Sequence, residues 1–253
     1  MRSELYNVDC LEFMKTLPAE SVSVICTDPP YKYLDHKLDR DFDEIIFFEQ
    51  AVRVLKDGGW IILFGRGTSF YRWNTMLADR GMVFKEEVVW DKMYSNTILN
   101  PLSRKHETIS IFVKGRGNIL QNRVPYIEKR LYSTDEMRQD IKRLLTVLNN
   151  NKELQALLSY LEKGELFSGI IRGESINRKA GIIDMNRVAS AMRSIREGVK
   201  EASIISVLNN TRKNIHPTEK PIRLIERLLQ LVTRGGAGIG SIFRFRQLSN
   251  CLP

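Results

Sequence analysis

The sequence predicts an α/β fold in which helices cover both faces of a parallel-rich sheet. Short apolar runs alternate with segments of helical period between residues 22 and 114, as in chains built from repeated strand and helix units. The length of 253 residues is enough to bury a substantial core. No apolar run approaches the roughly 20 residues of a membrane span, and the N-terminus lacks the apolar segment of a signal peptide. We therefore expect a soluble, cytoplasmic protein.

The expected elements of the first half follow one another in alternation. Residues 22–27 form an apolar run typical of a buried strand, and residues 43–56 carry apolar side chains at helical spacing up to Gly58 and Gly59. A second helix is expected at residues 68–80. The remaining strands are expected at residues 60–65, 82–91 and 107–114.

The second half has a different texture. Residues 115–118 read as a linker, and helices are expected at residues 134–149, 152–163 and 185–200. Their apolar side chains recur at helical spacing, which fits either their own core or a homodimer contact. The sequence does not distinguish these two explanations.

Charge is distributed unevenly along the chain, which carries a net +9. Residues 1–117 hold 16 basic and 17 acidic side chains, whereas residues 118–253 hold 23 basic and 13 acidic ones. A basic excess in one segment is what phosphate neutralisation in DNA binding requires, although a solvated face has the same composition. The basic face of the last expected helix consists of Arg187, Arg193, Arg196 and Lys200.

The chain offers no obvious metal site. Its three cysteines, Cys10, Cys26 and Cys251, lack the spacing of metal ligands and fit a reducing compartment. His36 and His106 have no partners at ligand spacing either, so we expect no metal.

Asp28-Pro29-Pro30-Tyr31 directly follows the strand predicted at residues 22–27, and it is the most informative segment of the chain. Ligands of open α/β sheets bind at the carboxyl ends of strands. Two prolines fix the backbone and leave carbonyl oxygens without ladder partners. A carboxylate and a carbonyl that accept the two protons of a nucleobase amine would raise its electron density for methyl transfer, and Tyr31 would stack on a flipped base.

The alternative for this segment is an ordinary Asp-Pro turn beside a buried tyrosine. Two neighbouring loops would serve the flipped base in the functional interpretation. Residues 32–40, with Tyr33 and Lys37, read as a mobile lid, and residues 93–104 contain Tyr94 at the same sheet edge.

The chain resembles the amino-group DNA methyltransferases, which methylate adenine or cytosine in DNA. Besides Asp28-Pro29-Pro30-Tyr31, similar segments occur in family order. They are Asn7-Val8-Asp9-Cys10-Leu11, Gly58-Gly59-Trp60-Ile61-Ile62-Leu63-Phe64, Val88-Val89-Trp90-Asp91-Lys92, residues 105–114 and His216-Pro217-Thr218-Glu219-Lys220-Pro221. This order resembles the β arrangement of the family.

The resemblance implies a Rossmann-like sheet that uses S-adenosylmethionine, with residues 1–117 and 214–233 in the α/β domain. It implies that residues 118–213 form an inserted, mainly helical target-recognition domain. The catalytic segment would be residues 28–31. The implied cofactor contacts are Asp9, Cys10, Asp28, His216, Pro217, Thr218 and Lys220.

The substrate implied by the resemblance is double-stranded DNA, and aspartate at the head of the tetrapeptide favours adenine over cytosine. A restriction-modification or phage role would bring a cognate restriction endonuclease as partner. An RNA amino-methyltransferase and an inactive DNA-binding remnant are the alternatives.

The family's Phe-x-Gly-x-Gly cofactor loop is not found after residue 233. Residues 236–240 are rich in glycine, but too few residues follow them for a phosphate-type loop with a helix behind it. We therefore expect residues 234–253 to be an atypical tail, as from a shifted reading frame, and cofactor binding to be impaired.

Overall fold

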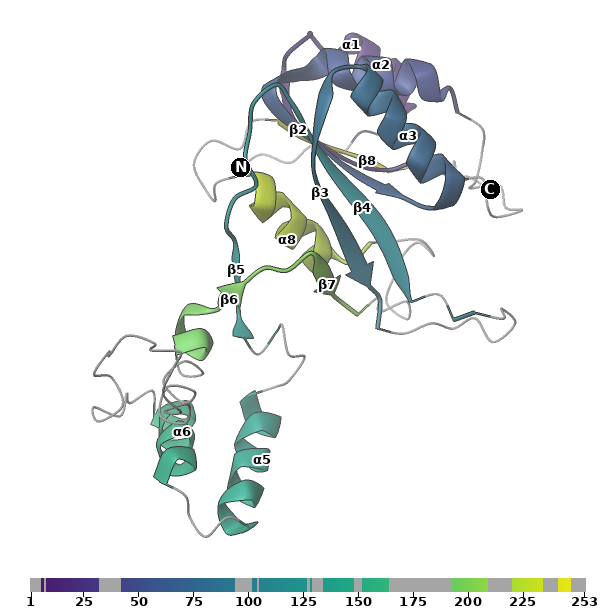
Figure 1. Ribbon diagram of the computed structural model, residues 1–253. Coiled ribbons are helices and arrows are strands. Elements are labelled where there is room, and N and C mark those ends of the chain that lie inside the picture. Colours follow the sequence, from purple (N-terminus) through teal and green to yellow (C-terminus); the bar gives the residue numbers. More distant parts are fainter. Residues whose placement is uncertain are drawn as a thin grey trace, which may run out of the picture. The chain divides into compact units, whose positions relative to one another are not determined.

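The computed structural model describes residues 6, 8–31, 42–93, 102–103, 105–126, 128, 134–147, 152–163, 193–208, 220–233 and 241–246. The chain divides into two compact units (Figure 1). The larger comprises Met1–Gln121 and Ala202–Pro253, and the smaller comprises Asn122–Glu201. The smaller unit thus falls inside the segment predicted as an insert.

A six-stranded sheet forms the centre of the larger unit. Its strands lie in the order β7-β3-β4-β2-β1-β8. Their bounds are β1 Val22–Asp28, β2 Leu55–Gly65, β3 Met82–Asp91, β4 His106–Lys114, β7 Ile204–Ser206 and β8 Ser241–Arg246.

The sheet is mixed rather than purely parallel. Strand β1 runs parallel to both β2 and β8, and β3 runs parallel to β7. Strand β4 is antiparallel to both of its neighbours, β2 and β3. The end of β3, the start of β4 and the end of β1 therefore all lie along the same side of the sheet, the side formed by the carboxyl end of β1.

One face of the sheet is covered by α1 (Cys10–Thr16), α2 (Glu44–Val54) and α3 (Gly67–Asp79). Asp43 caps α2, because its Oδ1 accepts from the backbone N–H of Ile46 at 2.9 Å. The shared apolar cluster contains Met14, Ile25, Phe48, Ile61 and Trp73. Alternate residues of the same strands face the opposite way, as the period of a strand requires.

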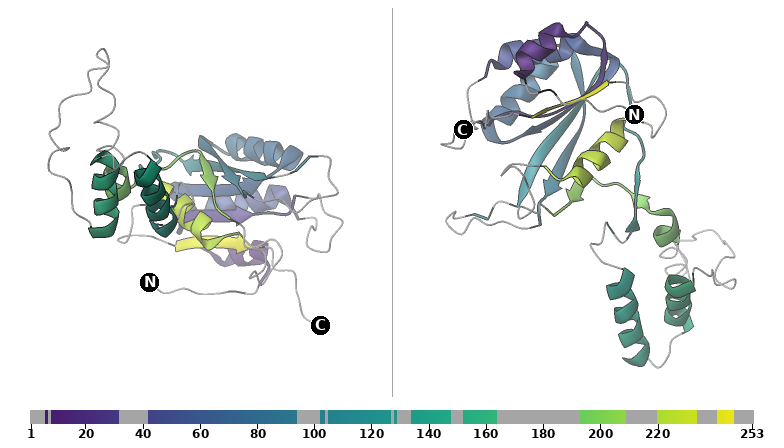
Figure 2. Two further views of the ribbon diagram at one scale, coloured as in Figure 1. Left: turned by 90° about the horizontal axis from the view of Figure 1, so that it is seen from below. Right: turned by 180° about the vertical axis from the view of Figure 1, so that it is seen from behind.

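Helix α8 (Ile222–Val232) covers the other face. Its Leu224 and Leu228 pack with Cys26, Ile62 and Trp90, and all five are buried. Figure 1 and the right view of Figure 2 show the unit from opposite sides, with α3 over one face and α8 over the other. The prediction that helices cover both faces is confirmed.

Strand β2 is longer than predicted, because it begins at Leu55, directly after α2. The register with β1 passes from Val22–Leu55 to Val24–Trp60, so residues 56–59 lie in an irregularity of the strand pair. Gly58 has φ +73 there, in the left-handed region that glycine tolerates. Gly58 and Gly59 therefore shape a bulge and do not end the helix.

Strand β8 is an element that we did not predict, since residues 234–253 were expected to lie outside the fold. Residues 241–246 pair in parallel with β1 from Val22 to Asp28. The backbone of this segment thus completes the sheet beside the strand that carries Asp28.

The smaller unit contains α5 (Thr134–Val147), α6 (Lys152–Lys163) and a two-stranded sheet of β5 (Arg123–Val124) and β6 (Val199–Lys200). Helices α5 and α6 pack together, as their apolar periodicity predicts. No helix within the described ranges is both long and apolar enough to cross a membrane.

The C-terminal end predicted for the helix at residues 185–200 is wrong. A helical turn covers residues 193–197, Gly198 follows with φ +74, and Lys200 lies in β6. A Cβ at Gly198 would lie 2.7 Å from the carbonyl oxygen of Val124, so β5 approaches too closely for a side chain. Residues 185–192 lie outside the described part.

Candidate active site

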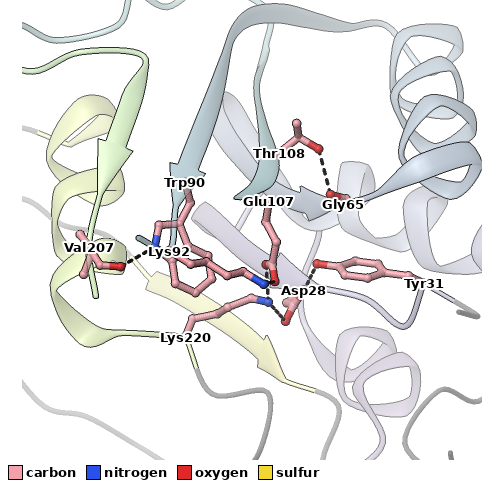
Figure 3. Close-up of polar contacts among 9 residues, drawn as sticks. All are labelled: Asp28, Tyr31, Gly65, Trp90, Lys92, Glu107, Thr108, Val207 and Lys220. Carbon is pink, nitrogen blue, oxygen red and sulfur yellow. Dashed lines mark hydrogen bonds and ion pairs between the residues drawn. The ribbon is translucent and has the colours of Figure 1, made fainter. Parts of the chain in front are cut away.

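Asp28 is the last residue of β1, and Tyr31 folds back onto it. The phenolic hydroxyl of Tyr31 donates to Asp28 Oδ1 (Figure 3). The backbone carbonyl of Tyr31 accepts from Ser69 Oγ of α3 at 3.2 Å, which ties the turn to the neighbouring helix. Pro29 is buried and Pro30 is half-buried. No hydrogen bond from the described part of the chain reaches either proline carbonyl.

Lys220 comes from the opposite end of the sequence and pairs with the same carboxylate. Its Nζ lies 2.9 Å from Asp28 Oδ2 and 2.7 Å from Glu107 Oε2. The side chain of Lys220 is 7% exposed, and that of Asp28 is 24% exposed. The ammonium group is therefore buried between two carboxylates, one of which remains partly open to solvent.

Glu107 links two lysines. It lies at the start of β4, and its Oε1 accepts from Lys92 Nζ at 2.5 Å. Lys92 directly follows β3, so the antiparallel pairing of β3 and β4 brings these two residues together. The network runs from Tyr31 through Asp28, Lys220 and Glu107 to Lys92, as Figure 3 shows.

Aromatic rings surround the ammonium of Lys220. Its Nζ lies 5.3 Å from the ring centre of Phe64, 5.7 Å from that of Trp90 and 6.0 Å from that of Tyr31. The Trp90 ring is fixed by its Nε1, which donates to the carbonyl of Val207 at 2.9 Å. Ring faces attract cations, so these rings add to the attraction of the carboxylates.

Gly65 allows the close packing behind the site. It ends β2, and a Cβ at this position would lie 2.1 Å from the ring of Phe70 in α3. Its carbonyl accepts from Thr108 Oγ1 of β4 at 2.9 Å, the contact drawn beside Glu107 in Figure 3. The strand end that carries Glu107 is thereby held against β2.

Burial and neighbouring charges shift the pKa values of Lys220, Glu107 and Tyr31. Burial alone would lower the pKa of Lys220, but Asp28 and Glu107 outweigh it and raise that pKa. Burial alone would raise the pKa of Glu107, but Lys220 and Lys92 outweigh it and lower that pKa. Burial, reinforced by Asp28, raises the pKa of the Tyr31 phenol well above its usual range, so this hydroxyl remains a donor.

Asp28 keeps acceptor capacity in this arrangement. A carboxylate has about four lone-pair positions, and Tyr31 and Lys220 each occupy one on different oxygens. A further N–H donor can therefore bind without displacing either partner. The site can therefore accept a proton of an amine at the end of β1, where the carbonyls of Pro29 and Pro30 have no hydrogen-bond partner in the described part of the chain.

The structure gathers only some of the residues predicted for the site. Asp28, Pro29, Pro30, Tyr31 and Lys220 lie together at the end of β1. The ammonium of Lys220 pairs with Asp28 and Glu107, and its predicted contact with the cofactor stays a prediction. The predicted residues Tyr33, Lys37, Tyr94, Arg187, His216, Pro217 and Thr218 lie outside the described part.

Asp9 and Cys10 occupy the start of α1. Asp9 Oδ1 accepts from the backbone N–H groups of Leu11 at 2.8 Å and Glu12 at 3.2 Å and so caps this helix. Burial and the Asp9 charge raise the pKa of the Cys10 thiol to about 11. Among the described contacts, none joins either residue to Asp28.

The residues predicted to contact S-adenosylmethionine fall only partly in the described ranges, which include Asp9, Cys10, Asp28 and Lys220. The contact of these four residues with the cofactor stays a prediction. In the described ranges no three His, Cys, Asp or Glu side chains gather as metal ligands would.

The helix predicted to carry the basic face does not reach Lys200, and the contact of its basic residues with DNA stays a prediction. Arg193 and Arg196 share a helical turn, but Arg196 pairs with Glu197 at 2.6 Å, and Lys200 lies exposed in β6. Sequence reasoning missed Glu107 and Lys92 as site residues. Both sit at the ends of apolar strands beside the tetrapeptide, and only the antiparallel pairing of β4 reveals their proximity.

Comparisons with known proteins show the family of the chain. The family model described as DNA methylase matches residues 22–239, and the chain belongs to this family. Type II methyltransferase M.BamHI of Bacillus amyloliquefaciens is 29% identical over 130 residues, which cover 44% of this chain and 29% of the relative. Type II methyltransferase M.BglII of Bacillus subtilis is 24% identical over 252 residues, which cover 91% of this chain and 56% of the relative.

The matched chain thus spans about half of M.BglII and less of M.BamHI. Among solved structures, the complex of M1.HpyAVI with SAM is 20% identical with a TM-score of 0.37, and the match covers 48% of this chain and 58% of that chain.

Proposed function

We propose that this protein transfers a methyl group from S-adenosylmethionine to the exocyclic amino group of adenine in DNA. The observation that carries the proposal is Asp28 at the end of β1, bonded to Tyr31 and Lys220 and still able to accept another donor. Membership of the DNA methylase family supports it. The reaction needs a group that accepts hydrogen bonds from a weakly nucleophilic amine, and Asp28 offers one.

The chemistry assigned to this chain concerns the amine. An exocyclic amine is a poor nucleophile because its lone pair is delocalised into the ring. Hydrogen bonds from its two protons to Asp28 and the Pro29 carbonyl would return electron density to nitrogen and orient it. These contacts strengthen as positive charge develops on nitrogen, so they favour the transition state over the bound substrate.

The base must leave the duplex to reach a carboxylate at a strand end. The proposed stacking partner of the flipped base is the ring of Tyr31, which is half-buried and lies next to Asp28. Adenine is proposed over cytosine because of the family resemblance of Asp28-Pro29-Pro30-Tyr31. The smaller unit, Asn122–Glu201, is the proposed target-recognition domain, and double-stranded DNA is the proposed partner.

The relatives are type II methyltransferases, which supports a place in a restriction-modification system and a cytoplasmic setting. The test is expression of the chain in a bacterial host that lacks DNA methylation, followed by mapping of modified bases in its genome. N6-methyladenine at one sequence motif is expected, and it should vanish with Asp28→Ala. Detection of N4-methylcytosine instead would show that the target base is cytosine and not adenine. Unmodified DNA from a folded protein would contradict the proposal.

A second candidate is a DNA-binding protein without turnover. It is favoured by one observation, that two of the residues predicted to hold the cofactor make other contacts, Asp9 as a helix cap and Lys220 with Asp28. This candidate predicts DNA binding with no affinity for S-adenosylmethionine. Titration calorimetry with the cofactor alone separates the two.

A further inference from the structure

Asp28 and Lys220 place an acceptor and a donor side by side at the proposed base site. Asp28 Oδ2 and Lys220 Nζ are 2.9 Å apart, and Asp28 is the more exposed of the two. Both groups carry full charge, which makes their hydrogen bonds stronger than those of neutral groups. A ligand that meets this pair encounters an acceptor next to a donor.

The donor has capacity to spare. A lysine ammonium has three N–H bonds, of which Asp28 and Glu107 take two. The third has no hydrogen-bond partner among the described residues, and the Nζ atom lies 5.3–6.0 Å from the ring centres of Phe64, Trp90 and Tyr31. Glu107, itself fixed by Lys92, prevents the ammonium from turning wholly toward Asp28.

The order of acceptor and donor matches only some nucleobases. Adenine and cytosine present an amino donor next to a ring-nitrogen acceptor, whereas guanine and thymine present a carbonyl acceptor next to a ring N–H. A keto base at this site would set its carbonyl against the Asp28 carboxylate and its N–H against the Lys220 ammonium. Mismatched buried polar groups of this kind strongly disfavour binding.

We propose that Lys220 is a specificity-determining residue that donates a hydrogen bond to the ring nitrogen beside the target amine, N1 in adenine. Asp28 accepts a hydrogen bond from the amine, and Lys220 donates one to the neighbouring ring nitrogen. Glu107 is the positioning residue that holds Lys220 in place. This inference rests on the proposed function, because it assumes that the amine binds at Asp28.

The experiment compares two nucleosides that differ at the atom in question. Binding of 2′-deoxyadenosine and of its 1-deaza analogue, in which carbon replaces N1, is titrated by ligand-observed NMR with the full chain. The wild-type protein is expected to bind deoxyadenosine about tenfold more tightly, the scale of one hydrogen bond to a charged group. Lys220→Met should reduce this ratio to about one.

Lys114→Met is the matched control. Lys114 lies at the far end of β4, and its ammonium is similarly engaged, with the carbonyls of Val52 and Leu55. Its removal should lower stability without altering the nucleoside ratio. If Lys220 were only a structural support, Lys220→Met would weaken both nucleosides equally and the ratio would stay near tenfold, which would overturn the inference.

Two wild-type measurements decide the matter if Lys220→Met does not fold. A ratio near one, or no binding of either nucleoside, overturns the inference. Binding of deoxyinosine, which carries a carbonyl and an N–H on the same edge, as tightly as deoxyadenosine also overturns it. The methylation map judges the proposed function separately, so an active enzyme with no N1 dependence would remove this inference alone.

Discussion

Lys220 Nζ lies 2.9 Å from Asp28 Oδ2, although the two residues belong to opposite ends of the chain. The contact joins the start of α8 to the end of β1 across the face of the sheet that α8 covers. Because Lys220 is nearly fully buried, its charge depends on Asp28 and Glu107, and their charges are in turn balanced by it. The proposed amine site is therefore assembled only when both ends of the larger unit are folded together.

Removal of the Lys220 charge should destabilise the protein. Lys220→Met leaves Asp28 without its cation and Glu107 with Lys92 alone, and a broken buried pair costs about 3 kcal/mol. Urea unfolding of the variant and wild type at neutral pH measures the loss. A difference below about 1 kcal/mol would show that the pair is solvated rather than buried.

Acid should weaken the wild type more than Glu107→Gln. The folded-state pKa of Glu107 is lowered by Lys220 and Lys92, so its stabilising contribution is present above the unfolded-state pKa and is lost as pH falls through the folded-state pKa. The free energy of unfolding of Glu107→Gln should be lower at neutral pH and should change less between neutral pH and the acid range. Identical pH slopes for both proteins would contradict the assignment of charge to Glu107.

Tyr31 should contribute in two separable ways. Tyr31→Phe keeps the ring but removes the hydroxyl that donates to Asp28, and it should cost about 1 kcal/mol of stability with little loss of base stacking. Tyr31→Ala should also weaken binding of the extruded base by about 1–3 kcal/mol. Fluorescence of 2-aminopurine at the mapped target position reports extrusion. Equal fluorescence with all three proteins would exclude a stacking role for the ring.

S-adenosylmethionine should bind the wild-type chain, and calorimetry at neutral pH measures this directly. Asp9→Ala should cost about 1 kcal/mol of stability through the lost cap of α1, whatever its effect on the cofactor. If Asp9 serves only as this cap, the affinity for the cofactor will be unchanged. An absence of any binding heat from the folded wild type would favour the second candidate, DNA binding without turnover.

The strands and most helices were predictable because their apolar periods are strong and local. Asp28 and Tyr31 were predictable for the same reason, since four consecutive residues carry the signal. The roles of Glu107 and Lys92 were not, because they arise from the antiparallel pairing of β3 with β4, which alternation of strands and helices does not predict.

Lys220 illustrates the same limit in another way. The neighbouring residues in the sequence predicted a contact with the cofactor. The ion pairs of its buried ammonium group with Asp28 and Glu107 were not predictable, because these carboxylates are distant in sequence. At Lys200 the helical period continued in the sequence, while the left-handed Gly198 ended the helix and let β6 pair with β5. Residues 241–246 were not predicted as a strand, because the family's cofactor-loop motif is not found before them. Their backbone nevertheless pairs with β1 as strand β8.

The central claim is that Asp28 binds the amine that becomes methylated. The most direct test measures transfer of labelled methyl from S-adenosylmethionine to DNA and, in parallel, to RNA, by the wild type and Asp28→Ala. Asp43→Ala is the matched control, because Asp43 caps α2 and has no contact with Asp28 in the described part of the chain. We expect label in DNA with the wild type and Asp43→Ala, and a rate at least about a hundredfold lower with folded Asp28→Ala. Equal transfer by wild type and Asp28→Ala would contradict the claim, as would label in RNA alone.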